Sequence, residues 1–154
     1  MAHYFCDSSA IVKRYVAETG TGWVIALTSP AIGNTVYLAR ITGVEVVSAI
    51  TRRLRRGALI PTDAQQAIYN FRADLPNDFA FVEVTPLLTA SAMNLAERHG
   101  LRGYDAVQLA AALQIQQGRL TANLSNVTFL SADAALNAAA QAEGLAVDNP
   151  NAHP

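Results

Sequence analysis

The chain has 154 residues, 51% of them hydrophobic and 15% charged, and this composition predicts one folded domain rather than a disordered chain. The formal net charge of -1 gives no overall attraction for nucleic acid or for an anionic membrane, so any phosphate-binding surface must be local. The only cysteine, Cys6, excludes an intrachain disulfide and a cysteine-based zinc site.

Apolar periodicity predicts strands and helices in alternation along the chain. In chain order, the predicted elements are a strand over 3–6, a helix over 10–17, a strand over 35–39, helices over 41–56 and 61–73, a strand over 79–84, helices over 86–100 and 105–118, a strand over 127–130, a helix over 133–142 and a strand over 145–147. This alternation predicts an α/β sandwich with a mostly parallel sheet. We expect residues 1–148 to form a single domain and the short tail 149–154 to be frayed.

Neither a membrane span nor a secretion signal is visible in the sequence. No run approaches the roughly 20 apolar residues that a membrane helix needs. The first residues show no basic segment followed by an apolar stretch of signal length. We therefore expect a cytoplasmic protein without a membrane partner.

Two acidic residues follow predicted strands. Asp7 comes directly after the first strand, and Asp133 comes shortly after the strand that ends at Leu130. Ligands of parallel sheets bind outside the carboxyl ends of the strands, so both acids are candidates for a functional site. The alternative is that each side chain only caps the helix that follows it.

Glu45 shares one face of its predicted helix with Arg52 and Arg56, at 100° per residue. The two arginines lie about 10 Å and about 16 Å farther along the helix, at 1.5 Å per residue. This face is either a solvated surface or a polar wall on which Glu45 binds a metal and the two arginines reach phosphate groups.

Asp105 begins a helix that is apolar on nearly every side and should therefore be buried. A carboxylate at the mouth of such a helix must be exposed, paired or bound to a cation, because an unpaired buried charge is very unfavourable. Arg102 is the candidate partner, and capping of the helix is again the alternative.

Taken together, the four acids have the chemistry of a magnesium or manganese site. Clusters of carboxylate oxygens suit Mg²⁺ and Mn²⁺. Hydrolysis of a phosphodiester needs a deprotonated water and a stabilised leaving oxygen, and metal ions held by carboxylates provide both. Carboxylates forced together without a cation would instead raise one another's pKa values.

The segments around these acids resemble the PIN-domain nucleases, and most closely the VapC-type toxins of bacterial toxin–antitoxin pairs. The matching segments are residues 5–15, 44–50, 104–112 and 129–136. They occur in the family's order and at family-like spacing. Residues 143–147 also look like the segment with which the family's domain usually ends. Each segment is loose by itself, whereas the ordered set of four is specific.

The resemblance implies a three-layer α/β/α fold with a central, mostly parallel sheet, and Mg²⁺- or Mn²⁺-dependent cleavage of RNA. It places the catalytic and metal-binding roles on Asp7, Glu45, Asp105 and Asp133. Ser9 and Ser131 match small polar positions that support the acids, and Ser131 keeps the hydroxyl of the threonine that is frequent there. The resemblance also implies a homodimer, a small antitoxin protein as partner and a cytoplasmic setting.

The sequence also bears on three other classes of protein. The chain has no GxxxxGK[ST] motif, which excludes a P-loop NTPase, and its three histidines are scattered. A nuclease fold that has become an inert RNA- or protein-binding adaptor would be expected to have lost one or more of the acids, but all four are present. A structure-specific DNA nuclease would share the carboxylate chemistry, but such enzymes usually carry extra basic helical segments.

Overall fold

The computed structural model describes all 154 residues. The strands are β1 (His3–Cys6), β2 (Thr35–Ala39), β3 (Ala80–Val82), β4 (Thr128–Leu130) and β5 (Ala146–Asp148). The helices are α1 (Ser8–Ile11), α2 (Thr21–Thr28), α3 (Thr42–Arg55), α4 (Pro61–Asp78), α5 (Pro86–His99), α6 (Gly103–Thr121) and α7 (Ala134–Ala142). Three short 3-10 helices are η1 (Val12–Arg14), η2 (Pro30–Ile32) and η3 (Pro150–Ala152). None of the helices combines the length and the apolar character that a bilayer crossing requires.

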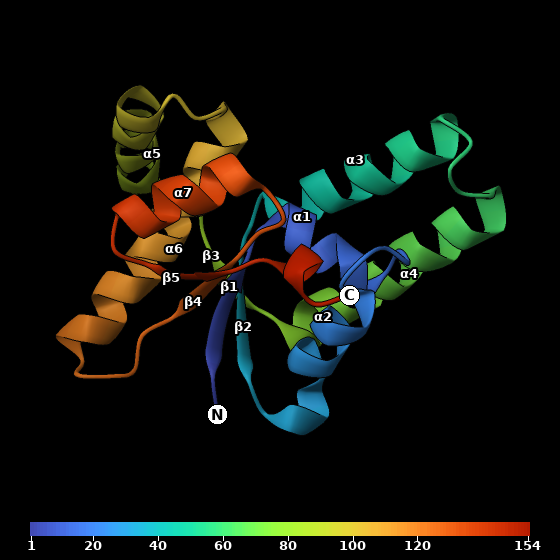
Figure 1. Ribbon diagram of the computed structural model, residues 1–154, viewed down its shortest axis with the longest axis horizontal. Coiled ribbons are helices and arrows are strands. Elements are labelled where there is room, and N and C mark those ends of the chain that lie inside the picture. Colours follow the sequence, from blue (N-terminus) through green and yellow to red (C-terminus); the bar gives the residue numbers. More distant parts are fainter.

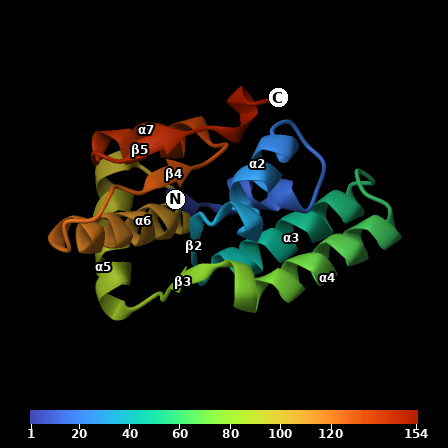
Figure 2. The same ribbon diagram turned by 90° about the horizontal axis from the view of Figure 1, so that it is seen from below.

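The five strands form one sheet in the order β3-β2-β1-β4-β5, and every neighbouring pair is parallel. Helices α5, α6 and α7 lie on one side of the sheet, and α1 to α4 lie on the other (Figures 1 and 2). The α/β sandwich predicted from the sequence is therefore confirmed, and its sheet is wholly parallel.

Each face of the sheet has its own hydrophobic core, because neighbouring strand residues point in opposite directions. Phe5 and Phe129 stack at 5.8 Å between ring centroids within the core under α5, α6 and α7. The next residues along these strands, Cys6 and Leu130, lie in the core on the α3 and α4 side. Short apolar strands with no polar alternation are what a sheet covered on both faces requires.

Several helices differ from the predicted ones, and α6 extends over Gly103–Thr121 where the prediction was 105–118. The helix expected over 10–17 begins at Ser8 and tightens into η1, which ends at Arg14. Helix α4 continues past the expected end near residue 73 to Asp78, with Pro76 in its last turn. Helix α2 was not predicted, and it begins after Gly20 in the left-handed conformation rather than after a polar capping side chain.

The C-terminal tail is ordered, so the expectation of a frayed segment was wrong. Pro150 of η3 is buried, and its carbonyl oxygen would lie 2.2 Å from a Cβ placed on Gly20. The Trp23 and His153 rings stack with centroids 4.0 Å apart, and His153 Nε2 lies 2.8 Å from Asp148 Oδ1. Residues 149–154 therefore pack on α2 through contacts that only the folded chain brings together.

Candidate active site

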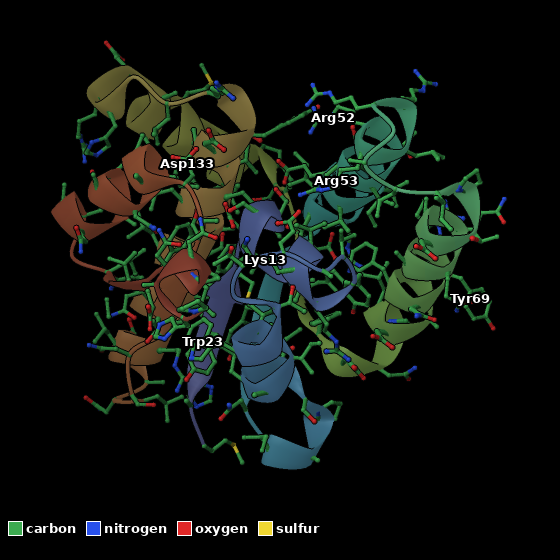
Figure 3. The ribbon with its side chains drawn as sticks, turned by 45° about the vertical axis from the view of Figure 1, so that its right-hand side comes forward. Lys13, Trp23, Arg52, Arg53, Tyr69 and Asp133 are labelled. Atoms are coloured by element: carbon green, nitrogen blue, oxygen red, sulfur yellow. The ribbon has the colours of Figure 1, made fainter.

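The four predicted acids lie at or near the carboxyl-end side of the parallel sheet. Asp7 follows β1 and Asp133 follows β4, and these strands are neighbours in the sheet. Glu45 lies in the first turn of α3, and Asp105 lies in the first turn of α6. Figure 3 shows Asp133 on one side of this region and Arg52 and Arg53 of α3 on the other.

Asp7 is the most enclosed of the four acids, with only 3% of its surface exposed. Its carboxylate accepts hydrogen bonds from Ser9 Oγ at 2.7 and 3.0 Å, from the Ala10 amide at 2.9 Å and from Ser131 Oγ at 2.9 Å. Burial nevertheless raises the pKa of Asp7 from its ordinary value of 3.8 to about 7, against the opposing effect of these hydrogen bonds and with a further rise from the charge of Glu45. The fold therefore holds a carboxyl group whose charged form it does not fully compensate.

Ser9 and Ser131 join the turn after β1 to the turn after β4. Ser9 Oγ accepts a hydrogen bond from the Ala132 amide at 2.9 Å, and Ser131 Oγ accepts one from the Asp133 amide at 3.0 Å. Because both hydroxyls also donate to Asp7, they fix its carboxylate relative to the backbone that carries Asp133. The structure thus places both predicted serines directly against Asp7.

Glu45 is held by a residue that the sequence analysis did not single out. Gln108 of α6, only 1% exposed, donates its Nε2 hydrogens to Glu45 Oε2 at 2.5 Å and to Thr42 Oγ1 at 2.9 Å. Burial raises the pKa of Glu45, Gln108 opposes this rise, and the charge of Asp105 adds to it. The only sequence signal for Gln108 is an amide in the middle of an otherwise apolar helical run.

Asp105 connects this pair to the fourth acid. Burial raises its pKa, the charge of Asp133 raises it further, and the charge of Arg102 lowers it. Arg102 forms no ion pair with Asp105, so the predicted partner acts only through its charge. The acids therefore influence one another in the sequence Asp7, Glu45, Asp105, Asp133, and none of them is paired with a basic side chain.

The capping alternative holds for two of the acids and fails for a third. Asp7 accepts a hydrogen bond from the Ala10 amide and Asp133 accepts one from the Leu136 amide at 2.9 Å, so both cap helices as well as lying in this region. Asp105 caps nothing, because α6 begins two residues before it at Gly103. A capping function therefore does not account for the position of Asp105.

Two cavities open beside the acids. One has a volume of about 530 Å³ and is lined by Ser8, Glu45, Arg52, Arg102, Gly103, Tyr104 and Asp105. The other, of about 430 Å³, is lined by Ser8, Ser9, Val12, Val44, Glu45, Ser48, Ala49, Arg52, Arg53 and Tyr104. Arg52 belongs to both linings and its charge lowers the pKa of Glu45.

The neighbouring arginines of α3 are placed differently. Arg53 lines the second cavity but is ion-paired with Glu18, which also binds Lys13 at 3.1 Å. Arg56, predicted together with Arg52, lines neither cavity and lies exposed at the end of α3. The structure therefore brings one of the two predicted arginines to the acids and leaves the other at a distance.

The donor set is suited to a small divalent cation bound partly through water. No three acidic, histidine or cysteine side chains lie close enough together to enclose a metal ion unaided. Mg²⁺ usually binds only one or two carboxylates and keeps several of its waters. Raised carboxyl pKa values at Asp7, Glu45 and Asp105, without a basic partner, are the imbalance that such a cation would relieve.

Comparison with known proteins gives relatives in sequence and in structure, although no family model matches the chain. Ribonuclease VapC45 and ribonuclease VapC49, from two strains of Mycobacterium tuberculosis, are each 33% identical over 112 residues, which cover 73% of this chain and 75% of theirs. The structure of PAE2754 from Pyrobaculum aerophilum is similar with a TM-score of 0.64 and 17% identity, over 98% of this chain and 91% of that one. VapBC2 from Rickettsia felis, bound to a DNA fragment from their promoter, is similar with a TM-score of 0.59 and 13% identity, over 96% of this chain and 98% of that one.

Proposed function

Since this chain belongs to the VapC ribonucleases, we propose that it is an endoribonuclease toxin that hydrolyses RNA phosphodiester bonds at the site formed around Asp7, Glu45, Asp105 and Asp133. The observation that carries the proposal is the mutual influence of these acids beside a cavity that also contains Arg52. Acidic groups that hold a cation and a basic group that binds phosphate are the two parts of a metal-dependent phosphodiesterase site.

We propose that the four acids hold Mg²⁺ or Mn²⁺, directly or through water. When bound, a divalent cation lowers the pKa of its water and neutralises the charge that develops on the phosphate. Asp7 is the central residue of this proposal, because its buried carboxylate keeps a fixed position through Ser9 and Ser131. Gln108 of α6 holds Glu45 in a similar way, by donating a hydrogen bond to Glu45 Oε2.

Arg52 is proposed to bind a phosphate next to the scissile one. It lines both cavities with Glu45 and has no ion-pair partner within the protein. A guanidinium group in this position would attract the RNA backbone toward the acids without adding negative charge to the site. Arg53 is less available for this purpose, because Glu18 already neutralises it.

The proposed partners are an RNA substrate, a small antitoxin protein and a second copy of the chain, in the cytoplasm. VapBC2 provides the precedent for a partner protein, because a chain similar to this one occurs there, bound to a DNA fragment from their promoter. An antitoxin would silence the nuclease most directly by placing an arginine or lysine against the acids, where it would compete with the cation.

The nuclease proposal is tested by incubating the purified protein with a mixed RNA pool, with and without Mg²⁺, and sequencing the new 5′ ends. We expect discrete cuts that EDTA abolishes and that Mg²⁺ or Mn²⁺ restores. Undiminished cleavage by metal-free protein in EDTA would refute the mechanism. Absence of cleavage together with retained RNA binding would identify an inert adaptor, and cleavage of DNA in preference to RNA would identify a DNA nuclease.

The toxin proposal is tested by induced expression in a bacterial host, with Asp7→Asn as the inactive control at matched protein levels. We expect growth arrest by the unaltered chain only, relieved when the adjacent small open reading frame is co-expressed. Equal growth with both forms would contradict the toxin function and leave the nuclease proposal to its own test.

A further inference from the structure

Tyr104 is an exposed aromatic side chain next to the acids. It precedes Asp105 in α6, so the two Cα atoms are about 3.8 Å apart. Its side chain is 60% exposed, although a tyrosine can bury a large apolar area. It lines both cavities that contain Glu45 and Arg52.

The same tyrosine also forms part of a third, apolar cavity on the other side of the α6 N-terminus. This cavity has a volume of about 300 Å³ and is lined by Thr89, Ala92, Met93, Ala96, Gly103, Tyr104, Ala106 and Val107. A volume near 300 Å³ is at the lower end of the range for small-ligand sites. Tyr104 therefore separates a polar site with acids and arginines from an apolar hollow between α5 and α6.

No contact within the protein explains why the ring stands in this place. Its hydroxyl makes no hydrogen bond, no other aromatic ring stacks on it, and no arginine or lysine lies over it. The other exposed tyrosine, Tyr69 with 70% exposure, lies on α4 and points away from the body of the molecule (Figure 3). Tyr104 differs from Tyr69 in having a hollow beside it and unpaired arginines in the cavity it lines.

We propose that Tyr104 stacks on a nucleobase of the RNA, the base of a nucleotide that adjoins the scissile phosphate, and that the apolar hollow beside it receives this base. The inference rests on the proposed nuclease function and adds a substrate-binding residue to it. Arg52 and Arg102 occur in the cavity next to the ring, so backbone phosphates and an unstacked base can be bound on either side of Tyr104. Unpaired bases of RNA are bound in this way, by aromatic stacking combined with basic groups for the backbone.

The test uses a short RNA that contains a mapped cleavage site, and versions of it that lack the base on either side of the cut. The proteins are the unaltered chain, Tyr104→Phe, Tyr104→Leu and the matched control Tyr69→Leu, each checked for its melting temperature and its mass in solution. Leucine keeps apolar bulk but removes the aromatic face, whereas phenylalanine keeps that face.

We expect Tyr104→Leu to lower kcat/KM on the complete RNA by about 5- to 100-fold, the range for loss of one stacked base. Tyr104→Phe and Tyr69→Leu should cleave like the unaltered chain. On RNA lacking the stacked base, the unaltered chain and Tyr104→Leu should cleave equally, because the contact is already absent.

Other outcomes overturn the inference. If the unaltered chain and Tyr104→Leu cleave the complete RNA with equal kcat/KM, the ring binds no base. The same conclusion follows if Tyr104→Leu lowers kcat/KM by the same factor on the complete RNA and on both base-deleted RNAs. In either case the nuclease proposal still stands. If Tyr104→Leu changes the mass in solution, the ring is a contact between two copies of the chain. If the unaltered chain cleaves no RNA at all, the nuclease proposal fails and this inference fails with it.

Discussion

Replacing Asp7 by asparagine should stabilise the metal-free protein, and the gain should grow with pH. The carboxyl pKa of Asp7 is about 7 in the folded chain and 3.8 ordinarily, a difference of about 3 pH units. At 1.36 kcal/mol per unit this corresponds to about 4 kcal/mol. Asp7 is only 3% exposed, so solvent screening reduces the figure little. Asparagine can accept fewer of the hydrogen bonds that Asp7 accepts, and this loss offsets about 1 kcal/mol of the gain in stability.

The pH dependence follows from where the proton is bound. Between pH values of 3.8 and about 7 the folded chain retains the Asp7 proton and the unfolded chain has lost it, so the free energy of unfolding falls as pH rises. Above about pH 7 Asp7 is ionised in both the folded and the unfolded chain, and the free energy of unfolding falls no further. The asparagine variant has no such proton, and its advantage over the unaltered chain should therefore increase by about 3 kcal/mol between about pH 5 and about pH 8.

Urea unfolding in EDTA, monitored by circular dichroism across this pH range, gives the free energy of unfolding of both proteins. Adding Mg²⁺ near pH 8 should stabilise the unaltered chain more than Asp7→Asn, because the proposed metal site includes the folded Asp7 carboxylate. A stability difference that stays constant with pH would refute the reasoning, since it would mean that Asp7 keeps its ordinary pKa in the folded chain.

Three further substitutions separate the other parts of the site. Asp105→Asn should leave the melting temperature within a few degrees and lower the RNA cleavage rate by about 100-fold or more; cleavage at the unaltered rate would remove Asp105 from the site. Arg52→Ala should weaken RNA binding and reduce the slope of log affinity against log salt by about 0.7, whereas Arg56→Ala, outside both cavities, should change the slope less. Gln108→Leu leaves Glu45 without its amide donor and should weaken Mn²⁺ binding by about 10- to 100-fold in calorimetry, and equal affinity would show that Gln108 only fills space.

Features fixed by local pattern were predictable from the sequence. The apolar runs of β1 and β4 and the glycine after α3 predicted the strands and a helix end close to their observed places. Asp7 and Asp133 were predicted to be site candidates because each follows a strand of a parallel sheet, and the structure makes their strands, β1 and β4, neighbours. Strand ends and sheet topology thus account for Asp7 and Asp133, whereas Glu45 and Asp105 were assigned to the site through the resemblance to the PIN-domain nucleases.

Features that depend on distant contacts were not predictable. Gln108 is one amide in an apolar helix, and nothing local indicates that it faces Glu45 across the boundary between α6 and α3. Helix α2 begins at Gly20, whose close approach to Pro150 joins residues at opposite ends of the chain. Arg56 shares a helical face with Arg52, but the cavities beside the acids extend only as far as Arg52 and Arg53, so position on the face was not enough.

The stacking of Trp23 on His153 gives this protein a built-in optical probe. The chain contains one tryptophan, so its fluorescence reports on a single place, the contact between α2 and the C-terminal segment. Release of residues 149–154 would expose the indole to water and shift its emission, without any added dye. A fluorescence titration would thus follow the docking of this segment separately from global unfolding, which circular dichroism records.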